Sequence, residues 1–116
     1  MPDADGYPTD EEIEKIKAWP MIDLPGWFAF IKSCWWAADW GWTERETEDR
    51  LLGRDRVRRY DISTGGWSGN EAVIDAMEAN KDWCWFFSWV SSRRGGHYSF
   101  EHPVKSLGPT ASRPLD

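Results

Sequence analysis

Ten of the 116 residues are tryptophan, and any fold of this chain must find places for them. Each indole brings a large apolar area, and a chain of this length has room for one hydrophobic core rather than two. The mean hydropathy of -0.68 understates that core, because tryptophan scores poorly on the hydropathy scale. We therefore expect one folded domain over residues 9–102.

The two ends of the chain lack any apolar periodicity. Residues 1–8 and 103–116 are rich in proline, glycine and small polar residues, so we expect a flexible N-terminus and a flexible C-terminal tail. No stretch approaches the ~20 apolar residues of a membrane helix, and the acidic start lacks the pattern of a secretion signal. These features predict a cytoplasmic protein that binds no membrane.

Charge and cysteine content exclude further classes. The net charge of -6 argues against binding of duplex nucleic acid, because that affinity comes mainly from Lys and Arg. The charge is uneven: residues 1–49 hold twelve acidic and four basic residues, and residues 50–116 hold eight acidic and ten basic residues. Cys34 and Cys84 lie far apart in apolar surroundings, which favours reduced core thiols. We expect no metal and no cofactor.

Two helices are predicted near the N-terminus. Thr9 followed by Glu12 forms a capping-box pattern that starts a short helix, and Pro20 ends it. Asp23 is placed to cap a second helix, with Pro25 in its first turn. The apolar residues that follow have helical spacing and predict one buried face, formed by Trp27, Phe28, Ile31, Cys34, Trp35 and Ala38.

The middle of the chain changes to strand patterns. Residues 39–43 alternate aromatic and polar residues, which predicts a short strand, and the mostly charged residues 44–56 predict a loop or a frayed helix. Residues 58–64 alternate again, with Tyr60 and Ile62 on one face, as expected of a half-exposed strand.

The C-terminal half is predicted to hold a third helix and a hairpin. Ser68 and Glu71 form a second capping-box pattern that starts a helix ending near Asn80. Residues 83–90 alternate bulky apolar side chains and predict a central strand, which residues 97–102 join as an antiparallel hairpin. The fold class that follows is α+β, with a small antiparallel sheet, formed by the hairpin and one or two further strands, packed by about three helices.

Two glycine-containing turns are the candidate binding site. The turn before the third helix offers backbone N–H groups to an anion, although neither the Walker A nor the dinucleotide fingerprint is present. The hairpin turn adds paired guanidinium groups and an imidazole, which suit phosphate or carboxylate. The candidate ligand-binding residues are Gly65, Gly66, Trp67, Ser68, Gly69, Asn70, Arg93, Arg94 and His97. Each turn also has a plain structural explanation, as a tight helix entry and as a solvated hairpin tip.

Three functions remain open from these residues. The leading hypothesis is a non-catalytic binding protein that holds an anionic, nucleotide-like small molecule between the two turns. The alternative is an acidic inhibitor of a host protein, which would use residues 3–14 together with Glu44, Glu46, Glu48 and Asp49. The second alternative is a small enzyme, for which the candidate groups are Asp61, Ser68, Glu71 and His97. The oligomeric state is not indicated.

Three motifs give the chain a resemblance to a family of small phage and prophage proteins. They are Trp40-Gly41-Trp42-Thr43-Glu44, Gly65-Gly66-Trp67-Ser68-Gly69-Asn70-Glu71 and Ser92-Arg93-Arg94-Gly95-Gly96-His97-Tyr98. The resemblance spans residues 9–102. It implies a bacterial host cytoplasm as the setting and a counter-defence role, such as that of an anti-CRISPR protein, and it implies no catalytic residue.

Overall fold

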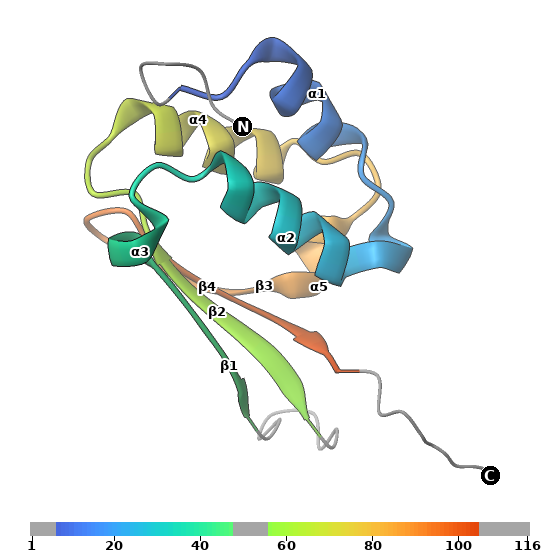
Figure 1. The fold of residues 1–116 in the computed structure, drawn as a ribbon. Coiled ribbons are helices and arrows are strands. Elements are labelled where there is room, and N and C mark those ends of the chain that lie inside the picture. The colour runs from blue at the N-terminus through green and yellow to red at the C-terminus, as the bar shows by residue number, and fades with distance from the viewer. Residues whose placement is uncertain (1–6, 48–55, 105–116) are drawn as a thin grey trace, which may run out of the picture.

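The chain folds into a four-stranded antiparallel sheet with its helices gathered on one side, as Figure 1 shows. The structure is a computed structural model that describes residues 7–47 and 56–104. In chain order the elements are α1 (Asp10–Ala18), the 3-10 helix η1 (Met21–Asp23), α2 (Leu24–Cys34), α3 (Ala38–Gly41), β1 (Trp42–Thr47), β2 (Val57–Ser63), α4 (Ser68–Glu78), α5 (Cys84–Ser88), β3 (Trp89–Arg93) and β4 (His97–Pro103). The strand order is β1-β2-β4-β3. This arrangement confirms the predicted α+β class.

The first two helices begin where the sequence predicts. The Thr9 hydroxyl accepts a hydrogen bond from the backbone N–H of Glu12 at 3.1 Å, and the Glu12 carboxylate accepts one from the N–H of Thr9 at 2.8 Å. The Asp23 carboxylate accepts one from the N–H of Gly26 at 3.1 Å and so caps α2. Each cap satisfies backbone donors that have no partner within the helix.

The apolar face of α2 forms the centre of the core. Trp27 and Phe28 are fully buried, and the Trp27 indole donates a hydrogen bond to the carbonyl of Ile16 in α1 at 3.0 Å. The Phe28 ring stacks on Tyr60 of β2 with 4.1 Å between ring centroids, and it also packs against Phe100 of β4. The helical stripe predicted from the sequence is therefore the contact between the helices and the sheet.

Strand alternation divides the sheet into two faces. Tyr60, Ile62 and Phe100 are buried and face the helices. The opposite face, here called the outer face, carries polar side chains toward the end where β2 and β4 meet the glycine turns. They include Thr43, Asp61, Ser63, His97 and Ser99.

Residues 39–41 and 44–47 differ from the prediction, whereas residues 42–43 lie in a strand as predicted. Residues 39–41 belong to helix α3, because the N–H groups of Trp40 and Gly41 both bond to the carbonyl of Ala37, each at 2.9 Å. Residues 44–47 lie in β1, where charged side chains pair across to β2, as in the Glu44–Arg58 ion pair. Residues 48–55 lie outside the described part of the chain, as do residues 1–6 and 105–116 of the two predicted flexible ends.

The predicted central strand over residues 83–90 is also wrong. Residues 84–88 form α5, and only the last two residues of the predicted strand belong to β3. The Asn80 side chain explains the change, because its carbonyl oxygen accepts hydrogen bonds from the backbone N–H groups of Asp82 and Cys84. These two hydrogen bonds form the turn that starts α5, and the alternation of apolar residues does not indicate it.

The predicted capping box of Ser68 and Glu71 is not formed. α4 begins at Ser68 itself, its N-cap is Trp67, and no side-chain hydrogen bond caps it. The Trp67 N–H bonds to the carbonyl of Thr64 at 3.0 Å, so the glycine turn closes one residue earlier than predicted. The Ser68 hydroxyl instead lies 2.7 Å from the hydroxyl of Tyr7. The strand over residues 97–102 and its antiparallel pairing in a hairpin are confirmed, but the partner strand β3 spans residues 89–93 and not 83–90.

Residues 7–47 and 56–104 contain no helix that is both long and apolar enough to cross a membrane.

Candidate functional site

A shallow depression of about 290 Å³ lies on the outer face of the sheet. Strand register assembles it: β2 pairs with β4 so that Ser63 lies opposite His97, and β3 pairs with β4 so that Arg93 also lies opposite His97. α3 closes one side with Trp40. The lining residues are Trp40, Gly41, Thr43, Asp61, Ile62, Ser63, Ser91, Arg93, His97, Tyr98 and Ser99.

The two glycine turns meet at one end of this depression. The N–H of Thr64 donates to the carbonyl of Gly96 at 3.0 Å, which joins the end of β2 to the hairpin turn. Gly96 has a φ of +80°, and a Cβ atom there would lie 2.2 Å from the Thr64 hydroxyl oxygen. Glycine is therefore required at this position by both backbone conformation and contact.

Two arginines and one histidine lie on the β3–β4 side. Arg93 is exposed and makes no ion pair with any residue of the described ranges, so its planar donors face solvent. The Nδ1 atom of exposed His97 lies 2.7 Å from the Ser63 hydroxyl, which orients the ring. Arg94 is exposed too, but it does not line the depression. Arg93 and His97 are thus the two predicted site residues that the structure places together in the depression.

The Trp40 indole forms the aromatic wall, and 69% of its surface is exposed. A Cβ atom on Gly65, whose φ is +64°, would lie 2.9 Å from the Trp40 ring. Gly65 therefore packs closely against the indole ring and does not line the depression. The sequence pattern assigned Trp40 to a strand, so its place in this site was missed.

The Asp61 carboxylate, which lines the depression, is paired with a neighbouring arginine. Arg59 bonds to Asp61 at 3.1 Å and to Glu101 at 2.9 Å, and the Ser99 hydroxyl donates to Asp61 at 2.7 Å. Burial opposes ionisation of Asp61, but the hydrogen bonds from Ser99 and Arg59 hold its pKa below the ordinary value. Asp61 and Ser99 share a face through the alternation of residues 58–64 and 97–102, a signal that was present in the sequence.

The remaining predicted site residues have structural contacts. Asn70 is only 2% exposed, and its side chain accepts a hydrogen bond from the N–H of Trp36 and donates to the carbonyls of Trp36 and Thr64. Trp67 is half-buried and packs against Trp36, with 5.0 Å between ring centroids. The residues that lie outside the depression are Gly65, Gly66, Trp67, Ser68, Gly69, Asn70 and Arg94.

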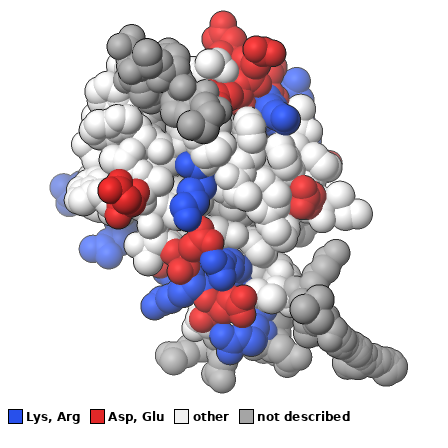
Figure 2. Space-filling view, in the orientation of Figure 1, with Lys and Arg blue, Asp and Glu red and all other residues white. Residues whose placement is uncertain are grey.

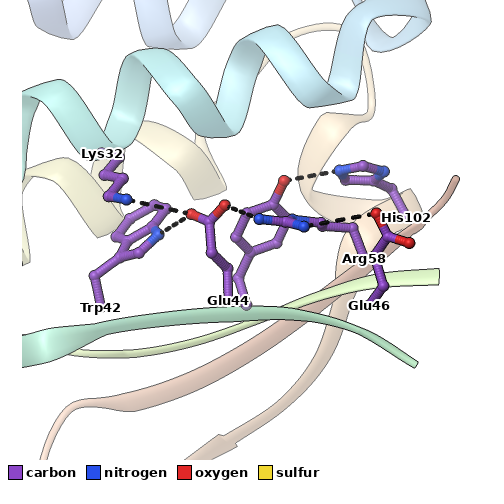
Figure 3. A network of polar contacts seen from close by, with 7 residues as sticks. Lys32, Trp42, Glu44, Glu46, Arg58 and His102 are labelled. Atoms are coloured by element: carbon purple, nitrogen blue, oxygen red, sulfur yellow. Dashed lines mark hydrogen bonds and ion pairs between the residues drawn. The ribbon is translucent and has the colours of Figure 1, made fainter.

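A second polar network lies between α2 and the sheet (Figure 3). The Tyr60 hydroxyl lies 2.9 Å from Nε2 of buried His102, whose Nδ1 lies 3.1 Å from the carbonyl of Pro103. With Nδ1 donating to that carbonyl, Nε2 accepts from Tyr60, so the ring is neutral. Burial lowers the pKa of His102 and raises the pKa of Tyr60 to about 12. These groups satisfy one another inside the core.

The carboxylates of β1 are also paired, which bears on the acidic surface considered above. Glu44 contacts Arg58 and lies 3.6 Å from Lys32, and the Trp42 indole donates to it at 2.8 Å. Glu46 lies within 3.7 Å of both Arg56 and Arg58. Figure 2 shows the resulting alternation of acidic and basic side chains over β1 and β2. Glu48 and Asp49 lie outside the described residues.

Groups proposed for an enzyme do not assemble. Asp61 and His97 line the depression, whereas Ser68 and Glu71 lie at the start of α4 and do not. Burial raises the pKa of Cys34 and of Cys84 to about 11, so both thiols stay protonated at neutral pH. Within the described ranges no group of three or more His, Cys, Asp or Glu side chains is placed to hold a metal ion.

The fold and the depression define a small α+β protein whose sheet has one face under helices and a polar hollow on the other. Comparison with known proteins found no matching family model, no matching curated protein and no matching solved structure.

Proposed function

We propose that this chain is a non-catalytic binding protein that holds an anionic, nucleotide-like small molecule on the outer face of its sheet. One observation carries the proposal: an exposed indole, a guanidinium group and an imidazole line the same depression. Trp40 supplies the aromatic surface, and Arg93 with His97 supplies donors for the anion.

The chemistry of each wall matches one part of such a ligand. Stacking of a base on an aromatic side chain contributes about 1–3 kcal/mol, and every base has a face that stacks. The guanidinium of Arg93 binds phosphate or carboxylate oxygens through two parallel donors. The hydroxyls of Ser63 and Ser99 also line the depression. After their hydrogen bonds to His97 and Asp61 they keep acceptor lone pairs for a sugar hydroxyl.

The size of the depression limits the ligand. Small-molecule sites commonly enclose about 300–1,000 Å³, and the depression of about 290 Å³ lies just below that range. A mononucleotide or a smaller anion therefore fits better than a dinucleotide. Cys34, Cys84 and Tyr60, whose pKa values are strongly raised, lie in the core, which favours binding over catalysis.

Calorimetric titration with AMP, adenosine and inorganic phosphate tests the proposal. AMP is expected to bind most tightly, because it engages both walls. Arg93→Ala is expected to weaken AMP at least tenfold, while Arg94→Ala, its exposed neighbour outside the depression, leaves the affinity unchanged. Equal loss in both variants would show a diffuse charge effect and overturn the site, and so would the absence of any AMP binding to the unaltered protein.

A further inference from the structure

Four large aromatic side chains are exposed together around α5, far in sequence from Trp40. Trp83 is 62% exposed and Phe86 67%, and Phe87 and Trp89 are each about half exposed. The Trp83 and Phe86 rings meet edge to face at 5.7 Å between centroids, and Phe86 meets Phe87 at 5.2 Å. Contiguous exposed apolar groups of this kind mark interaction sites more often than single exposed residues do. We name these four residues the α5 aromatic surface.

The backbone that carries this surface is strained at one residue. Trp83 has a φ of +71°, a left-handed conformation that bulky residues rarely adopt. The turn is held by Asn80, whose side-chain amide group donates to the carbonyls of Ile16 and Trp19 in the α1 region. The N–H of Lys81 also bonds to the carbonyl of Lys17 at 2.8 Å. A strained residue held from several sides is a frequent feature of binding sites.

An acidic stripe lies beside the α5 aromatic surface. Glu71, Asp75 and Glu78 are exposed on α4 at spacings of four and three residues, so they share one helix face. Among the described residues none of the three makes an ion pair. All three act on Tyr98, whose pKa is raised first by burial and then by these carboxylates. We name these three residues the α4 acidic stripe.

The stripe and the aromatic surface are continuous. Glu78 lines a hollow of about 320 Å³ together with Trp83, Phe86 and Lys81. Tyr98, whose pKa the stripe raises, packs against Trp85 of α5 at 6.2 Å between ring centroids. Lys81 brings one positive charge to this hollow, and exposed Asp82 brings one more negative charge beside it. The surroundings of the rings are therefore acidic overall.

We propose that the α5 aromatic surface, with the α4 acidic stripe, docks a basic amphipathic segment of a partner protein. The apolar side of that segment covers the rings, which supply the area that interface anchors need. Its Lys and Arg side chains lie along the stripe and over the indole faces. A second copy of this chain fits poorly, because it brings the same acidic stripe and a net charge of -6. Nucleic acid is repelled for the same reason.

A titration with two synthetic peptides tests the proposal. One is an 18-residue helical peptide of Leu and Lys, and the other is its charge-matched counterpart with Ser in place of every Leu. The Leu–Lys peptide is expected to bind, and the Ser–Lys peptide at least tenfold more weakly. Phe86→Ser is expected to weaken binding of the Leu–Lys peptide at least tenfold, whereas Trp40→Ser, at an exposed indole on the outer face of the sheet, leaves that binding unchanged.

Trp83→Gly separates binding from folding. Glycine adopts a φ of +71° without a steric cost, so the variant is expected to keep or raise the melting temperature while it loses peptide affinity. A combined Glu71→Gln, Asp75→Asn and Glu78→Gln variant is expected to reduce both the affinity and its salt dependence. Equal affinity of the Leu–Lys peptide for the unaltered protein and for Phe86→Ser would overturn the proposal. Sedimentation showing a dimer that Phe86→Ser dissolves would also overturn it, in favour of a second copy.

Discussion

Two groups of aromatic side chains in this molecule differ in the backbone that carries them. In the buried group, Trp27 and Phe28 lie on α2 and Tyr60 lies on β2, elements of seven residues or more. In the exposed group, Trp40 lies on α3 and Phe86 on α5, helices of four and five residues. The same residue types therefore contribute to the core on α2 and β2 and to the surface on these two short helices.

Backbone conformation sharpens this contrast. Within the described residues the non-glycine residues with positive φ are Ala37 and Trp83, and each is the N-cap of one of the two short helices. A left-handed residue of this kind costs on the order of 1–3 kcal/mol. Exposed Trp40 and Phe86 thus follow left-handed helix entries, whereas buried Trp27 and Phe28 follow the Asp23 cap, which has a negative φ. These exposed side chains are the ones that the two proposals above assign to ligand and partner binding.

The largest expected difference between the groups is in stability. Phe28→Ala removes a ring that contacts Tyr60, Trp27 and Phe100 at the centre of the core. It is expected to lower the free energy of unfolding by about 3–5 kcal/mol. Phe86→Ala is expected to change it by no more than about 0.5 kcal/mol, because that ring is mostly exposed. Urea denaturation of the two variants measures both, and a comparable loss in Phe86→Ala would break the contrast.

Asn70→Ala tests a residue that the sequence assigned to the ligand and the structure places in the core. Its side chain joins the backbone of Trp36 to that of Thr64, so its loss leaves buried polar groups without a partner. The free energy of unfolding is expected to fall by about 1–3 kcal/mol. AMP affinity of the folded fraction should stay unchanged. If Asn70→Ala keeps its normal stability but loses AMP binding, Asn70 contacts the ligand and the structural assignment is wrong.

Acid pH is expected to lower the free energy of unfolding through the buried side chain of His102. Burial lowers the pKa of His102 below its ordinary value of 6.5, with Arg58 adding to the shift, and Glu44 and the Pro103 carbonyl opposing it. The folded state therefore favours neutral His102. Its contribution is complete above pH 6.5 and is lost as the pH falls through the lower pKa of the folded state.

Denaturant titrations between pH 8 and about pH 5 measure this loss. His102→Gln is expected to flatten the stability profile in that window. Glu44 and Asp61 contribute only at more acid pH, because their pKa values lie below their ordinary values of 4.5 and 3.8. A profile that keeps the same slope in His102→Gln would show that another group titrates there.

The smallest expected effect concerns the strained entry to α3. Ala37→Gly removes the steric cost of a φ of 59°, although glycine also gains entropy in the unfolded chain. The net result is expected to be an increase in the free energy of unfolding of up to about 1 kcal/mol. A loss of more than about 0.5 kcal/mol by thermal or urea unfolding would show that Ala37 is not strained.

The sequence predicted elements whose stabilisation is local. The Thr9 and Asp23 caps and the helical stripe of α2 all depend on residues within one or two turns of each other. The alternation of Tyr60 and Ile62 similarly located β2. Local patterns failed for α3 and α5, because a left-handed entry and the Asn80 side chain define those helices, and alternating aromatics there imitate a strand.

The candidate site was predictable only in part for the same reason. Arg93 and His97 stand out as a basic turn in the sequence, and strand register brings that turn to the first glycine turn. The place of Trp40 depends on α3 and on its contact with Gly65, which no local pattern shows. The anionic ligand and the resemblance to phage proteins stay predictions.

The most direct test follows the tryptophan indole N–H signals in ¹H–¹⁵N spectra during titration with AMP. The Trp40 signal, assigned by its disappearance in Trp40→Phe, is expected to shift in a saturable manner, while the buried Trp27 signal stays in place. Adenosine should shift it less at equal concentration, and Arg93→Ala should weaken the response at least tenfold. A Trp40 signal that does not move at millimolar AMP, or that moves equally in Arg93→Ala, would contradict the proposed binding site.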